Sequence, residues 1–226
     1  MALLDLSAAF DTVDHDVLLQ RLLISYGIDG MASMWFRSYL SDRFQYVTVR
    51  SGKSPIVLMR YGVPQGSVLG PILFLLYTAD LVKLIESHGL NVHLYADDTQ
   101  VYGFSPPSSV DQLQMRMSAC IDEVASWMSS NRLQLNANKT EMLWCASTRR
   151  QSQLPTSPFR VCNDNVTPST ALRDLAIFLD SDVSMRSQVS WTVSHCFGIL
   201  RQLRTIRRSV TQCLSVSCYG VGVDEA

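Results

Sequence analysis

Residues 94–102 have the sequence Leu-Tyr-Ala-Asp-Asp-Thr-Gln-Val-Tyr, which places two adjacent carboxylates, Asp97 and Asp98, between two apolar runs. The runs cover residues 92–95 and 101–104, the length of short strands, so the pattern predicts a β-hairpin with the aspartates at its turn. An isolated aspartate pair at a turn is most often only solvated. Two segments upstream favour a catalytic interpretation.

The first of these segments, residues 3–11, is Leu-Leu-Asp-Leu-Ser-Ala-Ala-Phe-Asp and puts Asp5 behind the start of an apolar strand. The second, residues 62–71, is the glycine-punctuated loop Gly-Val-Pro-Gln-Gly-Ser-Val-Leu-Gly-Pro. An aspartate on one strand and an aspartate pair on a neighbouring hairpin can hold two divalent cations about 4 Å apart for in-line phosphoryl transfer. Carboxylate oxygens are hard ligands that suit two Mg²⁺ ions, with Mn²⁺ as the alternative.

In this order, the three segments resemble motifs A, B and C of the reverse transcriptase palm. They are Leu-Asp-Leu-Ser-Ala-Ala-Phe-Asp-Thr-Val-Asp-His, Gly-Val-Pro-Gln-Gly-Ser-Val-Leu-Gly-Pro-Ile-Leu-Phe and Tyr-Ala-Asp-Asp-Thr-Gln. The residues of these motifs are more similar to those of the non-LTR (LINE-type) retrotransposon enzymes than to those of the retroviral ones, and the similarity runs from residue 3 to about residue 208. One motif alone would be a weak signal, whereas three in order, with two weaker motifs after them, are a strong one.

The resemblance implies a metal-binding role for the aspartates. Asp5, the backbone carbonyl of Leu6, Asp97 and Asp98 would hold the two Mg²⁺ ions. Asp97 alone can complete a two-metal bridge with Asp5, so this bridge does not require Asp98.

The resemblance also implies residues that meet the nucleotide. Phe10 stands five positions after Asp5, where the family has an aromatic steric gate against the ribose 2′-hydroxyl; without the motif it would be a core aromatic. Gln65 and Gly66 would lie against the incoming nucleotide and the template base, since glycine allows close approach and the amide both donates and accepts. Lys139 lies in a segment that resembles motif D and would protonate the pyrophosphate leaving group. A lone lysine in a polar loop is otherwise usually solvated.

Two features follow toward the C-terminal end. Residues 173–180 resemble motif E, the primer grip, with Ala176 where the family commonly has glycine. Residues 186–208 have helical spacing, with an expected inward face of Val189, Val193, Cys196, Leu200, Leu203 and Ile206. The helix ends in the only concentrated basic patch that the sequence pattern indicates, a candidate contact for the primer-template backbone whose alternative is a solvated helix face. Its members are Arg201, Arg204, Arg207 and Arg208.

The expected fold class is α+β: a polymerase palm with a mainly antiparallel sheet backed by helices, the fingers largely missing and a rudimentary thumb helix. The palm is assigned to residues 1–183, the partial thumb helix to 184–210 and an irregular tail to 211–226. Helices are expected over 16–26, with Gly27 as the stop, over 31–40 (burying Met34, Trp35 and Tyr39), and over 73–87. A helix over 110–130 is expected to carry an apolar stripe of Leu113, Met117, Ile121, Val124 and Met128. Asp11 and Asp14 are expected to be solvated or to cap a helix. A hairpin over residues 44–61 says nothing about function by itself.

The composition is that of an ordinary globular protein, with 47% hydrophobic and 17% charged residues. A net charge of −1 is unusual for a protein that holds a polyanion, so the basic surface is either local or missing. Six scattered cysteines indicate neither a zinc site nor a disulfide framework, and favour buried, reduced thiols of an intracellular protein. The longest apolar run, residues 68–77, is about half the length of a membrane span, and Asp5 argues against a signal peptide. Nucleus and cytoplasm both stay open.

The resemblance implies an RNA-directed DNA polymerase in which a primer 3′-hydroxyl attacks the α-phosphate of a deoxynucleoside triphosphate. Its partners would be an RNA template, a DNA primer and other segments of a retrotransposon polyprotein. One alternative is a catalytically incompetent retroelement fragment that only folds or binds nucleic acid weakly, which the missing fingers and the near-neutral charge support. Another is a palm polymerase that copies RNA into RNA, against which Phe10 argues if it is a steric gate.

Overall fold

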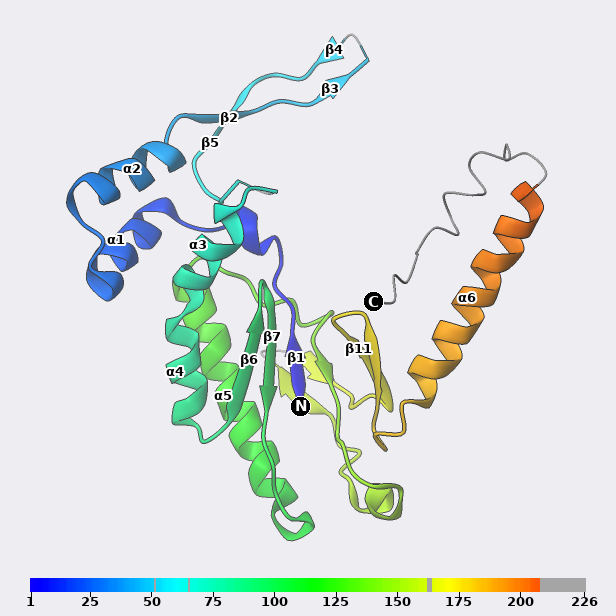
Figure 1. Ribbon diagram of the computed structural model, residues 1–226. Coiled ribbons are helices and arrows are strands. Elements are labelled where there is room, and N and C mark those ends of the chain that lie inside the picture. Colours follow the sequence, from blue (N-terminus) through cyan, green and yellow to red (C-terminus); the bar gives the residue numbers. More distant parts are fainter. Residues whose placement is uncertain (51, 65, 162–163, 208–226) are drawn as a thin grey trace, which may run out of the picture.

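The computed structural model describes residues 1–50, 52–64, 66–161 and 164–207. Within these ranges the chain is α+β, with helices packed on one face of a small antiparallel sheet, as the sequence predicts (Figure 1). The helices are η1 (Ala9–Asp11), α1 (His15–Tyr26), α2 (Gly30–Leu40), α3 (Leu69–Thr78), α4 (Asp80–Ser87), η2 (Pro107–Ser109), α5 (Val110–Ser130), η3 (Thr148–Gln153) and α6 (Arg186–Ile206). The strands are β1 (Ala2–Leu4), β2 (Arg43–Gln45), β3 (Thr48–Val49), β4 (Gly52–Lys53), β5 (Val57–Met59), β6 (Asn91–Tyr95), β7 (Asp98–Tyr102), β8 (Glu141–Met142), β9 (Phe159–Val161), β10 (Asp164–Val166), β11 (Ala171–Asp174) and β12 (Ile177–Asp180).

The central sheet has the strand order β6-β7-β1-β8, and each pairing is antiparallel. The first strand of the chain is therefore an inner strand, with β7 on one side and β8 on the other. β6 and β7 form the predicted hairpin, in which Tyr95 pairs with Asp98. Ala96, with a φ of 54°, and Asp97 make the turn, so the second aspartate belongs to the strand.

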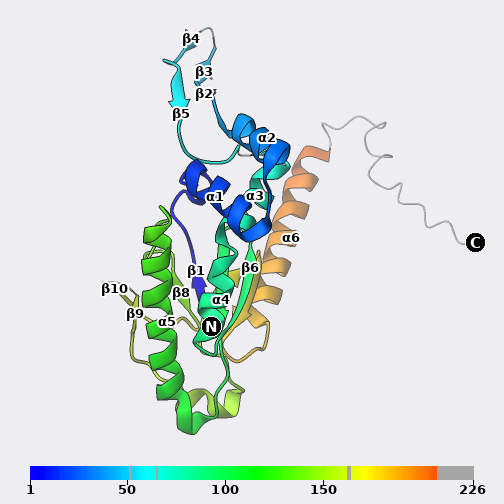
Figure 2. The ribbon, with the colours of Figure 1, turned by 90° about the vertical axis from the view of Figure 1, so that its left-hand side faces the viewer.

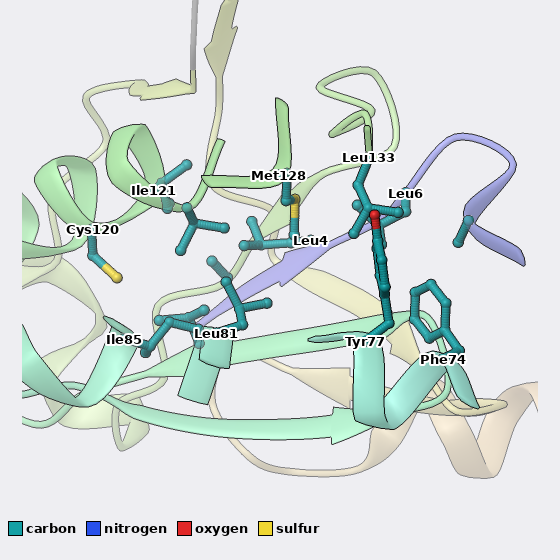
Figure 3. Packing of buried hydrophobic residues seen from close by; sticks show 14 of the residues in the cluster. Leu4, Leu6, Phe74, Tyr77, Leu81, Ile85, Cys120, Ile121, Met128 and Leu133 are labelled. Atoms are coloured by element: carbon teal, nitrogen blue, oxygen red, sulfur yellow. The ribbon is translucent and has the colours of Figure 1, made fainter. Parts of the chain in front are cut away.

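The core lies between this sheet and helices α3, α4 and α5 (Figure 3). The stripe predicted for α5 is confirmed, because its apolar side chains at helical spacing are all buried: Leu113, Met117, Ile121, Val124 and Met128. They meet Leu4 of β1, Leu81 and Ile85 of α4, and Tyr77 of α3. The helices thus cover one face of the sheet, and the other face carries the polar residues described below.

The ends of α1 follow the local signals of the sequence. The carboxylate of Asp14 accepts hydrogen bonds from the backbone N–H groups of Asp16 and Val17, the expected capping role. Gly27 ends the helix with a φ of 66°, the left-handed conformation that glycine adopts most readily.

Two predictions about helix faces are wrong. In α2, Met34 is 63% and Trp35 54% exposed, whereas Tyr39 packs against the core as expected, together with Phe36 and Leu40. No residue of α6 is buried, and the side chains expected to face inward are exposed. α6 follows β12 and stands away from the central sheet (Figure 1), so its apolar residues have no described element to cover them along most of its length.

Two further expectations need adjustment. The helix expected over residues 73–87 is divided into α3 and α4, which meet at Ala79. The expected burial of the cysteines is confirmed for Cys120, and burial raises the pKa of its thiol to about 12. The expectation is wrong for Cys145 and Cys196, which are exposed. Among the helices of the described ranges, none has both the length and the apolar character that crossing a bilayer requires.

A two-stranded ribbon projects from the end of the molecule formed by α1 and α2 (Figures 1 and 2). It consists of β2 paired with β5 and, farther out, β3 paired with β4. This is the hairpin expected over residues 44–61. Gln65, Arg208 and the tail expected over residues 211–226 lie outside the described residues.

Candidate active site

The register of the sheet brings Asp5 beside Asp98. Leu3 of β1 pairs with Gln100 of β7. Side chains alternate along a strand, so the next residue on the same face is Asp5 after Leu3 and Asp98 before Gln100. Because the strands are antiparallel, these two positions are opposite each other. Directly opposed residues of an antiparallel pair have Cβ atoms about 4.5–5.5 Å apart. Both carboxylates therefore lie on the face of the sheet that the helices leave open.

Asp5 and Asp98 line a cavity of about 120 Å³ together with Gln100, Lys139 and Asp174. Nζ of Lys139 lies 3.4 Å from Oδ1 of Asp5. The structure thus brings together three of the four predicted catalytic residues. Asp97, the fourth, is in the adjoining turn and is not among the residues that line the cavity.

Like charges gather at this cavity. The pKa of Asp98 is raised above its ordinary value, first by burial and then by the carboxylates of Asp97, Asp5 and Asp174. Burial also raises the pKa of Asp174, although its hydrogen bond with Gln100 acts in the opposite direction. Such a cluster favours a bound cation, since a positive charge would relieve the repulsion.

The residues fit a divalent cation in their chemistry. Oδ1 of Asp5 is buried and has no hydrogen-bond partner in the described part of the chain, and Lys139 faces it only as an ion pair. Carboxylate oxygens are ligands that suit Mg²⁺, and this one is not used by another group. No group of three or more His, Cys, Asp or Glu residues in the described ranges is already arranged to hold a metal ion.

Leu6 continues the strand beyond Asp5 and is buried. It forms a β-bridge with Leu135, in which the N–H of Ser7 donates to Gln134 and the N–H of Asn136 donates to the carbonyl of Asp5. These bonds use the carbonyl of Asp5 rather than that of Leu6. They also hold the segment that carries Lys139 against the segment that carries Asp5.

Phe10 is half-buried and packs on Phe74 of α3, with ring centroids 4.9 Å apart. Its carbonyl accepts a hydrogen bond of 2.8 Å from the N–H of Val63, which fastens the glycine-rich loop to the Asp5 segment. Gly62 makes this approach possible: its φ is 86°, and a Cβ there would come within 2.9 Å of Cα of Asp11. Gly66 also has a positive φ, of 78°, with open space around it.

The basic residues predicted to bind nucleic acid are only partly described. Arg201, Arg204 and Arg207 are exposed near the C-terminal end of α6. Figure 1 shows this end of the helix far from β12, where α6 begins. The structure therefore does not group these arginines with the carboxylate cavity.

Asp174 is a cavity residue that sequence reasoning missed. Nε2 of Gln100 donates hydrogen bonds of 2.8 and 3.0 Å to the two oxygens of its carboxylate. This contact ties the hairpin of β11 and β12, which forms a sheet of its own, to the central strand β7. The two partners are 74 residues apart, so no local pattern could have identified the pair.

Comparisons with known proteins add to this geometry. A family model described as reverse transcriptase (RNA-dependent DNA polymerase) matches residues 1–173. A probable RNA-directed DNA polymerase from transposon BS of Drosophila melanogaster is 28% identical over 206 residues, which are 89% of this chain and 22% of that protein. The RNA-directed DNA polymerase from mobile element jockey of the same species is 30% identical over 143 residues, 61% of this chain and 15% of that protein.

Among solved structures, telomerase from Candida albicans in complex with a TWJ fragment of telomeric RNA aligns with a TM-score of 0.47. The identity is 14%, over 81% of this chain and 31% of that one. The chain spans about a fifth or less of the length of the curated relatives that it matches.

Proposed function

Because this chain belongs to the reverse transcriptase family and its relatives are polymerases of non-LTR retrotransposons, we propose that it carries a nucleotidyl-transfer site of its own. The reaction would add a deoxynucleotide to a primer 3′-hydroxyl, directed by an RNA template. The observation that carries the proposal is the register of β1 and β7, which sets Asp5 beside Asp98 on the open face, with Lys139 in the same cavity.

The carboxylates would hold the metal ions, and the lysine would supply a proton. Asp5 and Asp98, with Asp97 at the adjoining turn and the carbonyl of Leu6, are the proposed ligands. Two Mg²⁺ ions bound there would activate the primer hydroxyl and neutralise charge on the pyrophosphate. Lys139, whose ammonium lies 3.4 Å from Asp5, would give a proton to the departing pyrophosphate.

Phe10 and the glycine-rich loop would select the nucleotide. Phe10, whose ring packs on Phe74, is the proposed steric gate against a ribose 2′-hydroxyl because it stands five positions after Asp5. The glycine-rich loop is fastened to the Asp5 segment and would meet the base pair through Gln65 and Gly66. Arg201, Arg204, Arg207 and Arg208 remain proposed contacts of the primer-template backbone.

Primer extension on an RNA template with Mg²⁺ tests this proposal. Asp97→Asn and Asp5→Asn should each reduce extension by about 100-fold or more, because each removes charge from the proposed metal ligands. Asp29→Asn is the matched control, since Asp29 is exposed and makes no capping hydrogen bond. Extension that survives both active-site substitutions would contradict the proposed role of these aspartates.

A second candidate is a polymerase domain that is incompetent without segments outside this chain. The observation that favours it is that Asp97 lies in the turn of the hairpin and is not among the residues that line the cavity of Asp5, Asp98 and Lys139. A folded chain that binds an RNA–DNA duplex but extends no primer would support this candidate.

A further inference from the structure

The projecting ribbon, residues 43–61, is a local basic surface. It holds four of the nineteen Lys and Arg residues of the chain and none of the twenty Asp and Glu residues. The four are Arg43, Arg50, Lys53 and Arg60. In a protein with a net charge of −1, this concentration makes the ribbon attractive to a polyanion.

Most side chains of the ribbon are exposed, whereas Arg43 and Met59 at its base are half-buried. Phe44 is 61%, Tyr46 48% and Tyr61 54% exposed. The strands of the ribbon pair only with one another, and a two-stranded ribbon alone is marginally stable in water. Exposed aromatic rings on such an element are available to a partner.

The outer part of the ribbon sets a cation beside an aromatic ring. Nζ of Lys53 lies 4.9 Å from the centroid of the Tyr46 ring. Lys53 pairs with Thr48, two positions after Tyr46, so the alternation of side chains puts all three on one face. Aromatic rings that stack on bases, next to cations that meet phosphates, are how proteins hold single-stranded nucleic acid.

The inner end of the ribbon adjoins the proposed nucleotide loop. Nη1 of Arg43 donates a hydrogen bond of 3.0 Å to the carbonyl of Gly62, which Nε2 of His15 also approaches at 2.8 Å. A hollow of about 550 Å³ there is lined by Arg43, Phe44 and Tyr61 of the ribbon, by Pro64 of the loop and by Asp11, among others. A strand that leaves the loop would therefore meet the ribbon directly.

We propose that the ribbon binds single-stranded RNA, with bases stacked on Tyr46 and Phe44 and phosphates on Arg50, Lys53 and Arg60. The identification of that strand as the template rests on the proposed function, whereas the binding itself needs no catalysis. A protein partner is the competing occupant, because aliphatic side chains of the ribbon are exposed as well. The charge of the ribbon favours RNA.

The test measures the fluorescence anisotropy of a labelled single-stranded RNA of about 16 nucleotides, with chelator and without nucleotide. The ribbon variant combines Arg50→Asn with Lys53→Gln; asparagine is chosen because Arg50 has a φ of 53°. The control combines Lys83→Gln with Arg116→Gln, two exposed positions on α4 and α5 that remove the same charge.

The ribbon variant should bind RNA about tenfold more weakly, with the slope of log affinity against log salt reduced by about 1.4, because each lost phosphate contact removes about 0.7. The control should bind like the wild-type chain. Tyr46→Leu should weaken binding about fivefold or more with little change in slope, since it removes stacking and no charge.

Equal weakening in the ribbon variant and the control would overturn the proposal, because net charge alone would then explain binding. Unchanged RNA binding in the ribbon variant would also overturn the proposal. If the ribbon variant changed its self-association instead, the ribbon would be identified as a protein contact. Thermal melts verify that each variant is folded, and Tyr46→Leu and Arg60→Gln provide the same test if the double variant is not. Asp97→Asn should bind RNA normally in this assay, which separates failure of the ribbon proposal from failure of the catalytic one.

Discussion

At the scale of single residues, the open face of the sheet concentrates acidic side chains that destabilise one another. Asp5 and Asp98 occupy adjoining register positions, and Asp174 lines the same cavity. The one cation in ion-pair contact with Asp5 among the described residues is Lys139, at 3.4 Å. This arrangement lowers the stability of the metal-free chain, as is common where a site is organised for a ligand.

The raised pKa of Asp98 has a consequence for stability against pH. The folded chain binds more protons than the unfolded chain between the ordinary and the raised pKa, so the free energy of unfolding falls as pH rises through that window. In chelator at neutral pH, Asp98→Asn should therefore be more stable than the wild-type chain, and the difference should vanish below the ordinary pKa of an aspartate. Urea denaturation across pH measures this, with Asp29→Asn as the control. A variant that is less stable at neutral pH would contradict the prediction.

The turn between β11 and β12 contains a strained alanine. Ala176 has a φ of 71°, a left-handed conformation that glycine adopts without strain. Ala176→Gly should raise the free energy of unfolding by about 0.5–1 kcal/mol, as relief of strain outweighs the added freedom of the unfolded chain. Chemical denaturation measures the change. Ala119→Gly, inside α5, is the control and should lower the free energy of unfolding by about 1 kcal/mol, because glycine destabilises a helix interior.

At the scale of elements, the structure separates what neighbours along the chain determine from what distant segments determine. The cap at Asp14, the stop at Gly27, the buried stripe of α5 and the hairpin of β6 and β7 follow from residues a few positions apart, and the sequence predicts each of them. The exposed face of α2 could not be predicted, because apolar residues surround the helix and its partner α1 decides which of them are buried. The amphipathic pattern of α6 likewise predicts a buried face that no described element supplies.

The candidate site divides in the same way. Motif resemblance identified Asp5, Asp98 and Lys139, which the structure brings to one cavity. It could not show that Asp98 rather than Asp97 stands beside Asp5, because a shift of one residue in the pairing register would exchange the two aspartates. Nor could it identify Asp174, since that contact depends on how a separate hairpin docks.

The docking of the β11–β12 hairpin gives a prediction of its own. Gln100→Leu removes both hydrogen bonds to the Asp174 carboxylate and leaves the charge unpartnered, a loss of about 1.5–3 kcal/mol. Hydrogen exchange should become faster in residues 171–180 and stay unchanged in the hairpin of β6 and β7. Gln114→Leu is the control, since its amide makes one exposed hydrogen bond, to Ser157. Unchanged exchange in residues 171–180 would show that other contacts hold the hairpin.

At the scale of the whole molecule, charge is unevenly distributed in a chain whose net charge is close to zero. Four acidic residues (Asp5, Asp98, Glu141 and Asp174) line the cavity on the open face of the central sheet, beside Lys139 and Arg173, whereas every charged residue of the ribbon is basic. Figures 1 and 2 show the ribbon at the end of the molecule beyond α1 and α2. A net charge of −1 therefore conceals a surface suited to a polyanion, which the total composition could not reveal.

The inner position of β1 also governs how the protein is made. Met142, a pairing partner of Ala2, stands 140 positions later in the chain. A ribosome that adds about 5–20 residues per second needs on the order of ten seconds to reach it. The hairpin of β6 and β7 can form as soon as it leaves the exit tunnel, whereas β1 must wait for β8 before both of its edges are paired. The nascent polypeptide thus presents an apolar strand with at least one unpaired edge throughout this interval, when chaperones have the opportunity to bind it.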